Sequence, residues 1–396
     1  MTTAPSARRA TAALERCVGD VRRFEAEFWG RRALHHRSAQ PFDDLMSFED
    51  VDHIISTMSL RLPMFRVVKD GATIPVGRYT KRGRTGSQPI TGLADPAGVV
   101  SLFADGATIV LQGMHRYWPP LAALCRDLEI TLGHRTQVNA YITPPGAAGL
   151  AVHEDAHDVF VLQAFGSKHW DVYERRGRAT ESGSGGGPVL SVDLRPGEGL
   201  YLPKRTPHAA RTQGTLSGHI TVGVVATTWG DVLAGVVDRL RHEPQFDEPL
   251  PAGFHRDGAA FAAALAARLE EVGRWLDKTD PAEVAAETVR RFLSSRPPLL
   301  KGLLLDVSRL GEIDDATTIA RRPGSVCELW RSGARLHVLL GDRELAMPAR
   351  LEPALERIRR SDRMRVGDLS AEVADAPSRA VLVRRLVREG LLEVIE

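Results

Sequence analysis

The chain contains little cysteine and no long apolar run. Its 396 residues include three cysteines, Cys17, Cys125 and Cys327, and no Cys-x-x-Cys pair. An odd number of widely spaced cysteines argues against a disulfide framework and favours a reducing compartment. No window holds the roughly eighteen apolar residues of a membrane span, and the first residues lack the apolar stretch of a secretion signal. These absences predict a cytoplasmic protein without a membrane partner.

The chain also lacks an excess of charge of either sign. Its 52 basic and 50 acidic residues give a net charge of +2 at pH 7. Such a balance provides no overall attraction to nucleic acid or to a membrane surface, so partners must be recognised locally. Hydrophobic residues make up 43% of the chain, which is ordinary for a globular protein, and the length allows two or three domains.

The most informative motif is His153-Glu154-Asp155, which is followed much later by His208. In an extended strand the side chains at positions i and i+2 share a face, so His153 and Asp155 can bind one ion while Glu154 points away. His208 would complete the site from a neighbouring strand. Two imidazoles and one carboxylate form the donor set of non-haem Fe(II) oxygenases, which leaves coordination positions open. The alternative is a polar sheet face that binds no metal.

The segments around this motif have the composition of strands joined by turns. Gln137–Thr143 and Asp158–Gln163 are rich in β-branched and aromatic residues. The segment Pro196–His208 resembles the second motif of the cupins, with Glu198 at its acidic position and Arg205 where glycine is usual. A strand that leads through a proline turn into His208 would place that histidine at the mouth of a small barrel, where ligand sites tend to form.

At these residues the sequence resembles the JmjC-type 2-oxoglutarate oxygenases, and within them the ribosomal oxygenases, which hydroxylate ribosomal proteins. The resemblance extends over roughly the first 230 residues. It implies Fe(II) as the metal and 2-oxoglutarate and O2 as cosubstrates, with His153, Asp155 and His208 as the metal ligands. The matching segments are Asn139–Pro145, His153–Asp155, Asp158–Trp170, and Leu202-Pro203 before His208.

The resemblance also implies the residues that contact the cosubstrate. In the family a basic residue fifteen positions after the first ligand binds the distal carboxylate of 2-oxoglutarate, and an asparagine fourteen positions before that ligand lies in the same pocket. These positions are Lys168 and Asn139. Burying a carboxylate without a cation would cost several kcal/mol, which makes the lysine its natural partner. Tyr141 and His219 are candidates for contact with the substrate, and a packing role is the alternative for each.

The composition changes after the barrel segment. Asp257–Leu276 has a helical period, and Asp280-Pro281 has the features of a second helix start. We expect an α+β protein: a double-stranded β-helix, or jelly-roll cupin barrel, with N-terminal helices over residues 1–230, a helical module over 231–310 and a winged-helix-like domain over 311–396. In the ribosomal oxygenases the helical module forms a dimer interface, which implies a homodimer here. The alternative is that these helices pack on their own barrel.

The last segment alternates helical and extended patterns. Leu351–Arg360 and Pro377–Glu389 are predicted helices, and Gly390–Ile395 is a predicted strand. Arg384 and Arg388, with Arg385 between them, lie on the outward face of the second helix, where they could contact phosphates. Nearby acidic residues dilute this positive charge, so a solvated face is the preferred interpretation and nucleic acid is not an expected partner.

The sequence therefore predicts an Fe(II)- and 2-oxoglutarate-dependent hydroxylase of a protein or peptide side chain, with a ribosomal protein as a candidate substrate. One alternative is the same chemistry on a small molecule or a biosynthetic peptide, because fold and metal ligands do not select a substrate. Another is a non-enzymatic cupin scaffold whose winged helix binds nucleic acid. The intact metal motif together with Lys168 argues against the scaffold.

Overall fold

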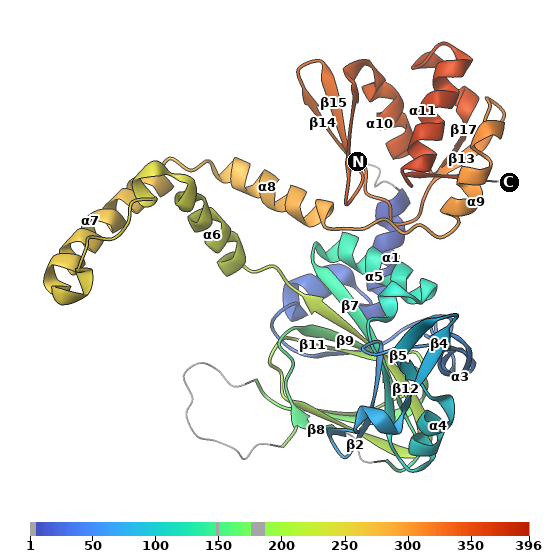
Figure 1. The fold of residues 1–396 in the computed structure, drawn as a ribbon. Helices are drawn as coiled ribbons and strands as arrows, with labels where there is room; N and C mark the ends of the chain where they lie inside the picture. The colour runs from blue at the N-terminus through green and yellow to red at the C-terminus, as the bar shows by residue number, and fades with distance from the viewer. Residues whose placement is uncertain (1–4, 148–149, 176–186, 396) are drawn as a thin grey trace. The chain divides into compact units, whose positions relative to one another are not determined.

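The computed structural model describes residues 5–147, 150–175 and 187–395 (Figure 1). Its contacts divide the chain into two compact units. The first unit contains Met1–Ala226, Leu299–Ser325 and Arg350–Glu396, and the second contains Thr227–Pro298 and Val326–Ala349. These units are not consecutive along the sequence, so the expected three-domain division over 1–230, 231–310 and 311–396 stays a prediction.

A ten-stranded sheet dominates the first unit (Figure 1). The strand order is β1-β11-β9-β12-β7-β6-β2-β3, with β10 paired to β9 and β8 paired to β12. All of these pairs are antiparallel. The strands are β1 Leu34–Arg37, β2 Phe65–Lys69, β3 Ala72–Thr73, β6 Thr108–Leu111, β7 Arg135–Thr143, β8 Leu150–His153, β9 Asp158–Val172, β10 Leu190–Leu194, β11 Glu198–Leu202 and β12 His208–Val225.

Strand β7 shows how the large sheet separates its core from its cavity. Val138, Ala140 and Ile142 are fully buried and belong to the main hydrophobic core. Asn139 and Tyr141 alternate with them and line a cavity on the other face, as the period of two in a strand requires. The strands predicted over Gln137–Thr143 and Asp158–Gln163 are confirmed.

Helices cover the apolar side of this sheet, and α1 and α5 contribute to the same core as β7. Ser47 begins α3 with a capping box, in which its hydroxyl accepts from the Asp50 backbone and the Asp50 carboxylate accepts from the Ser47 backbone. A separate hairpin pairs β4, Thr80–Thr85, with β5, Gln88–Ala94. The helices of this region are α1 Pro5–Val18, α2 Val21–Arg23, α3 Phe48–Thr57, α4 Pro96–Ala104 and α5 Pro119–Leu132.

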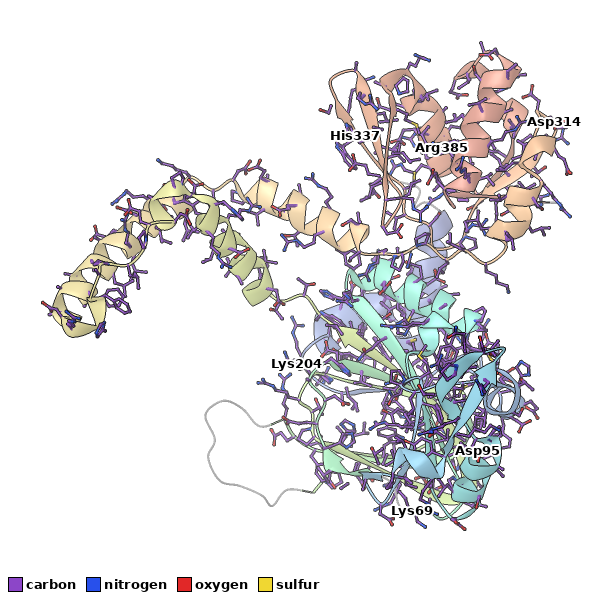
Figure 2. The ribbon with its side chains drawn as sticks, viewed as in Figure 1. Lys69, Asp95, Lys204, Asp314, His337 and Arg385 are labelled. Carbon is purple, nitrogen blue, oxygen red and sulfur yellow. The ribbon has the colours of Figure 1, made fainter. Side chains whose placement is uncertain are left out.

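The second unit contains three helices and a three-stranded meander. Asp280 caps α8 by accepting a hydrogen bond from the Ala282 backbone, which confirms the predicted helix start. Helices α7 and α8, which are described in full, contain no buried residue. His337 lies on the meander (Figure 2). The elements are α6 Trp229–Asp238, α7 Gly258–Leu276, α8 Pro281–Ser294, β14 Glu328–Ser332, β15 Arg335–Leu339 and β16 Glu344–Pro348.

The C-terminal part of the first unit combines helices with a sheet of order β17-β13-β18. The predicted helices and the predicted strand near the C-terminus are confirmed to within two residues. Two of the three arginines predicted on the outward face of α11 have partners inside the protein: Arg384 donates to the carbonyls of Gly311 and Ile313, and Arg385 pairs with Glu389 at 2.8 Å. The elements are α9 Leu303–Ser308, β13 Thr318–Arg321, α10 Glu352–Arg360, β17 Arg363–Arg365, α11 Ala376–Arg388 and β18 Leu392–Ile395.

None of the helices in the described ranges combines the length and the apolar character that crossing a bilayer requires.

Candidate metal centre

The three predicted metal ligands come together in the structure. His153 is the last residue of β8 and His208 is the first of β12, and the two residues face each other in the antiparallel pairing. Their ring centroids are 4.4 Å apart. One potential ligand atom from each of His153, Asp155 and His208 lies within 4.8 Å of the other two. This spacing allows a single ion to contact all three side chains.

Asp155 reaches the site from outside the strand, and here the sequence-based expectation needs correction. Strand β8 ends at His153, so the two residues do not form an i, i+2 pair on one strand. The Asp155 carboxylate nevertheless lies 3.7 Å from Nε2 of His208. Its backbone carbonyl accepts a hydrogen bond of 2.8 Å from Arg205, which has a φ of 60°. That left-handed conformation explains why the cupin motif usually has glycine at this position.

Backbone carbonyls determine which nitrogen of each histidine is free. Nδ1 of His153 lies 2.9 Å from the Ala151 carbonyl, and Nδ1 of His208 lies 2.9 Å from the Thr206 carbonyl. Because a carbonyl only accepts, each Nδ1 carries the hydrogen and each Nε2 keeps its lone pair. Burial lowers the pKa of His208, which favours the neutral, metal-binding form of its ring. Two neutral nitrogens and one carboxylate fit Fe(II).

Lys168 is a buried cation in the same cavity. Its side chain is 5% exposed, and its Nζ donates to Oγ1 of Thr143 at 3.2 Å. Among the described residues no carboxylate forms an ion pair with it, and burial lowers its pKa to about 8. A buried ammonium without an anion is unfavourable, so the site favours an anionic ligand. Asn139 lies nearby, with its side-chain oxygen accepting from the Gly113 backbone at 3.0 Å.

Tyr141 and His219 stack against each other in the cavity, with centroids 5.0 Å apart and rings nearly parallel. They are register partners on β7 and β12. Burial, followed by the charge of Lys168, lowers the pKa of His219 well below its usual value, so the ring is neutral. Its Nδ1 has no hydrogen-bond partner among the described residues. Both residues lie where a ligand can reach them, and their contact with substrate stays a prediction.

All seven predicted site residues line one cavity. The structure adds residues that the sequence-based analysis missed, including Arg66, Thr108 and Gln137. Burial raises the pKa of the Tyr141 hydroxyl, and the positive charge of Arg66 opposes that effect. Long-range strand pairing brings Arg66 to the cavity, because β2 pairs with β6 and β6 pairs with β7. The one local signal was a charged residue inside the apolar run of β2. The predicted residues in this cavity are Asn139, Tyr141, His153, Asp155, Lys168, His208 and His219.

His157 also lines the cavity but does not join the metal ligands. Its Nε2 lies 3.1 Å from the side-chain nitrogen of Gln137.

Residues 115–232 match the family model of the JmjC domain. Over this segment the chain is similar to JmjC-domain proteins. It is 31% identical over 217 residues to a bifunctional lysine-specific demethylase and histidyl-hydroxylase NO66 from Drosophila erecta, a match that covers 52% of this chain and 32% of that protein. It is 29% identical over 250 residues to ribosomal oxygenase 1 from Rattus norvegicus, with 58% and 40% covered. The matches therefore span well under half the length of these curated relatives.

Solved structures extend the similarity over the whole fold. The structure of YcfD, a ribosomal oxygenase from Escherichia coli, has a TM-score of 0.53 and 18% identity, and the match covers 95% of this chain and 98% of that chain. A structure of YcfD in complex with cobalt and 2-oxoglutarate has a TM-score of 0.52 at the same identity and coverage. At this identity the likeness establishes the fold.

Proposed function

We propose that this protein is an Fe(II)- and 2-oxoglutarate-dependent oxygenase, and that its large sheet forms a double-stranded β-helix of the cupin type. The observation that carries the proposal is the pairing of two features in one cavity. One is the set of His153, Asp155 and His208, whose ligand atoms lie within 4.8 Å of one another. The other is Lys168, a buried cation that forms no ion pair with a carboxylate of the described residues. A dicarboxylate that also contacts a metal satisfies both.

The proposed roles of the residues follow from their contacts. His153, Asp155 and His208 hold Fe(II) through two Nε2 atoms and one carboxylate oxygen. Lys168 binds the distal carboxylate of 2-oxoglutarate, and Thr143 shares the Nζ contact. Bound Fe(II) supplies the activation of O2: 2-oxoglutarate is oxidised to succinate and CO2, and a substrate C–H bond becomes C–OH. The neutral His219 ring and Tyr141 shape the cavity beside the site and exclude water from it.

For the substrate we propose a protein or peptide side chain, with ribosomal proteins as the first candidates. The similarity to proteins named ribosomal oxygenase supports this choice. The test incubates the full-length chain with Fe(II), 2-oxoglutarate and a set of ribosomal-protein fragments. Succinate should form together with a peptide that has gained one oxygen by mass spectrometry. Turnover only with small molecules would instead favour the alternative, a biosynthetic hydroxylase.

We also propose that the helices of the second unit form a homodimer interface. They expose large apolar side chains, with Trp229 82% exposed and Leu269 61% exposed. Large apolar side chains exposed on neighbouring elements of the sequence are candidates for a contact with another chain. For the C-terminal part of the first unit we propose a winged-helix-like fold without a nucleic-acid role, since Arg384 and Arg385 have partners within the protein.

The three cysteines are buried and free, which supports a cytoplasmic location.

A further inference from the structure

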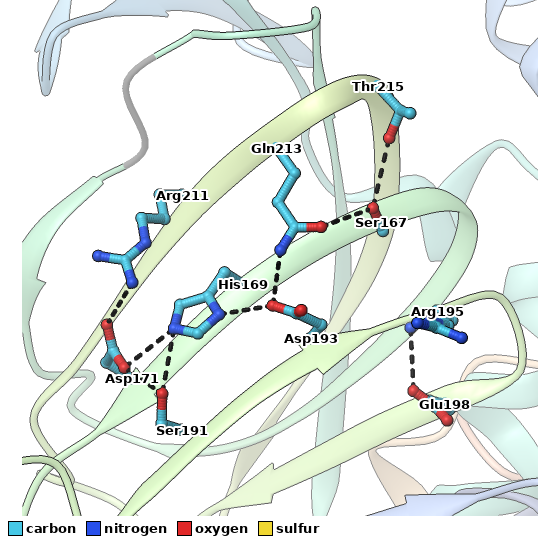
Figure 3. A network of polar contacts seen from close by, with 10 residues as sticks. All are labelled: Ser167, His169, Asp171, Ser191, Asp193, Arg195, Glu198, Arg211, Gln213 and Thr215. Carbon is cyan, nitrogen blue, oxygen red and sulfur yellow. Dashed lines mark hydrogen bonds and ion pairs between the residues drawn. The ribbon is translucent and has the colours of Figure 1, made fainter.

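Strand β9 carries polar side chains on both of its faces. Lys168 and Trp170 line the cavity. His169 and Asp171 alternate with them and therefore lie on the opposite, outer face of the sheet. There they meet side chains from β10 and β12 (Figure 3). We call this group the outer clasp, and its members are His169, Asp171, Ser191, Asp193 and Gln213.

The outer clasp is held together by short polar contacts. Nδ1 of His169 lies 2.5 Å from the carboxylate of Asp193, and its Nε2 lies 3.1 Å from that of Asp171. Ser191 donates to Asp171 at 2.8 Å, and the Gln213 amide donates to Asp193 at 2.7 Å. The hydrogen bond from Ser191 lowers the pKa of Asp171, and the contact with His169 lowers the pKa of Asp193. Both carboxylates are therefore ionised at neutral pH.

The clasp lies where the backbone pairing of β9 is interrupted. Lys168 pairs with Thr212, but the next pair joins Gly166 to Ser217, so residues 213–216 of β12 have no register partner on β9. Gln213 belongs to this unpaired stretch. Its side chain reaches Asp193 on β10, and it accepts a hydrogen bond from Ser167 on β9 at 3.3 Å. Side chains thus connect the three strands at the position where the ladder of β9 and β12 is broken.

Two other interpretations of this cluster fail on its geometry. Ser191, His169 and Asp193 have the residue types of a hydrolase triad, and the Ser191 hydroxyl lies 3.1 Å from Nε2 of His169. That hydroxyl, however, donates to the Asp171 carboxylate at 2.8 Å, so its hydrogen is directed to a carboxylate and not to the imidazole. A shared metal ion is also excluded, because Asp171 and Asp193 contact opposite nitrogens of the ring.

We propose that the outer clasp is a positioning device for Lys168, and through it for 2-oxoglutarate. The inference rests on the proposed function, which assigns Lys168 to the distal carboxylate. His169 is the next residue along β9, so a clasp that fixes its side chain also fixes the backbone from which Lys168 extends. Within the described ranges the buried ammonium has one hydrogen-bond partner, the Thr143 hydroxyl. A small displacement of β9 would therefore misplace its charge relative to the ligand. None of the clasp residues is among the described residues that line the cavity, so all of them act through Lys168.

The test compares His169→Gln with a matched control. His337 on β15 also pairs with a carboxylate, Glu344, at 2.6 Å on an exposed strand face of the other unit. The Kd of 2-oxoglutarate is measured anaerobically by calorimetry, on the full-length chain loaded with Mn(II). Contacts that orient a ligand-binding residue typically contribute 10-fold or more, so the Kd should rise roughly tenfold in His169→Gln. It should stay unchanged in His337→Gln.

A second variant and a double variant separate positioning from general destabilisation. Gln213→Leu keeps the imidazole but removes the bridge across the broken ladder, and it should also raise the Kd. In a Lys168→Ala background, His169→Gln should add no further change, because the group that it positions is absent. An unchanged Kd in both single variants, or additive effects in the double variant, would overturn the inference while leaving the oxygenase proposal intact. Failure of the unaltered protein to bind 2-oxoglutarate would remove both.

Discussion

The two units place their polar and apolar groups in opposite ways. In the large sheet, ionisable side chains are enclosed: Lys168, His208 and His219 are each at most 5% exposed and line one cavity. In the second unit, α7 and α8, described throughout their length, bury none of their residues, and Leu269 is 61% exposed. An enclosed polar group needs a partner, and so does an uncovered apolar one.

The difference teaches which kind of partner each region needs. The cavity is complete within one chain, because its metal ligands, its cation and its neutral rings all come from the first unit. It requires a small anionic ligand and an ion. In the proposed homodimer, the exposed helices contact another apolar surface. Substitutions in the cavity should therefore alter ligand binding, whereas substitutions on the helices should alter assembly.

The largest effect is expected from Asp155→Ala. Removing the carboxylate leaves two neutral nitrogens, which cannot balance the charge of Fe(II), so both retained iron and succinate formation should fall to background. Metal analysis after gel filtration measures the retained iron, and a coupled assay measures succinate formation. The neighbouring Glu154 is exposed and supplies the matched control. The Glu154→Ala variant should retain iron and form succinate as the unaltered protein does. Equal iron content in the two variants would contradict the ligand assignment.

The Lys168→Ala variant should retain iron but bind 2-oxoglutarate more weakly. A hydrogen bond to a charged group contributes about 1.5–3 kcal/mol, so the KM for 2-oxoglutarate should rise roughly 10- to 100-fold. The exposed Lys204 provides the control variant Lys204→Ala (Figure 2). A KM that stays the same in Lys168→Ala would place the distal carboxylate elsewhere.

The pH dependence of 2-oxoglutarate binding should follow Lys168. Burial lowers its pKa from 10.5 to about 8, so the ammonium is present below pH 8 and is progressively lost above it. Binding of a dianion favours the protonated form. The affinity should therefore be constant below pH 8 and fall above it, by up to about tenfold per pH unit. Calorimetric titrations between pH 7 and pH 9.5 measure this affinity. An affinity for 2-oxoglutarate that rises with pH would contradict the assignment of Lys168.

The smallest effect on catalysis is expected from Leu269→Glu on α7. A charge on the exposed apolar face should convert a dimer to a monomer in size-exclusion chromatography with light scattering, while turnover of a free peptide stays within about twofold. Val100→Glu, at an exposed position of α4, is the control and should leave the mass unchanged. If the unaltered protein is already a monomer, the dimer proposal is wrong.

The sequence predicted the parts of the site that depend on short spacing. His153, Asp155 and Lys168 lie within sixteen consecutive residues, where the metal motif and its resemblance to the JmjC oxygenases identified them. The end of β8 at His153 was not predicted, because a period of two does not mark where a strand stops. Asp155 therefore lies in a different local structure from the expected one.

Residues that depend on long-range pairing were missed for a physical reason. Arg66 reaches Tyr141 only through two strand pairings, and no local pattern encodes those. Thr143 shares a strand face with Asn139 and Tyr141, and that alternation could have identified it. The outer clasp depends on the interrupted ladder of β9 and β12, a feature that composition does not reveal.

The most direct test of the central claim is an anaerobic titration of the full-length chain with Fe(II) and 2-oxoglutarate, followed by absorption spectroscopy. We expect a metal-to-ligand charge-transfer band that saturates at one equivalent of iron and is absent in Asp155→Ala. A protein that shows no such band with both ligands in excess would contradict the assignment of His153, Asp155, His208 and Lys168 to one cofactor site.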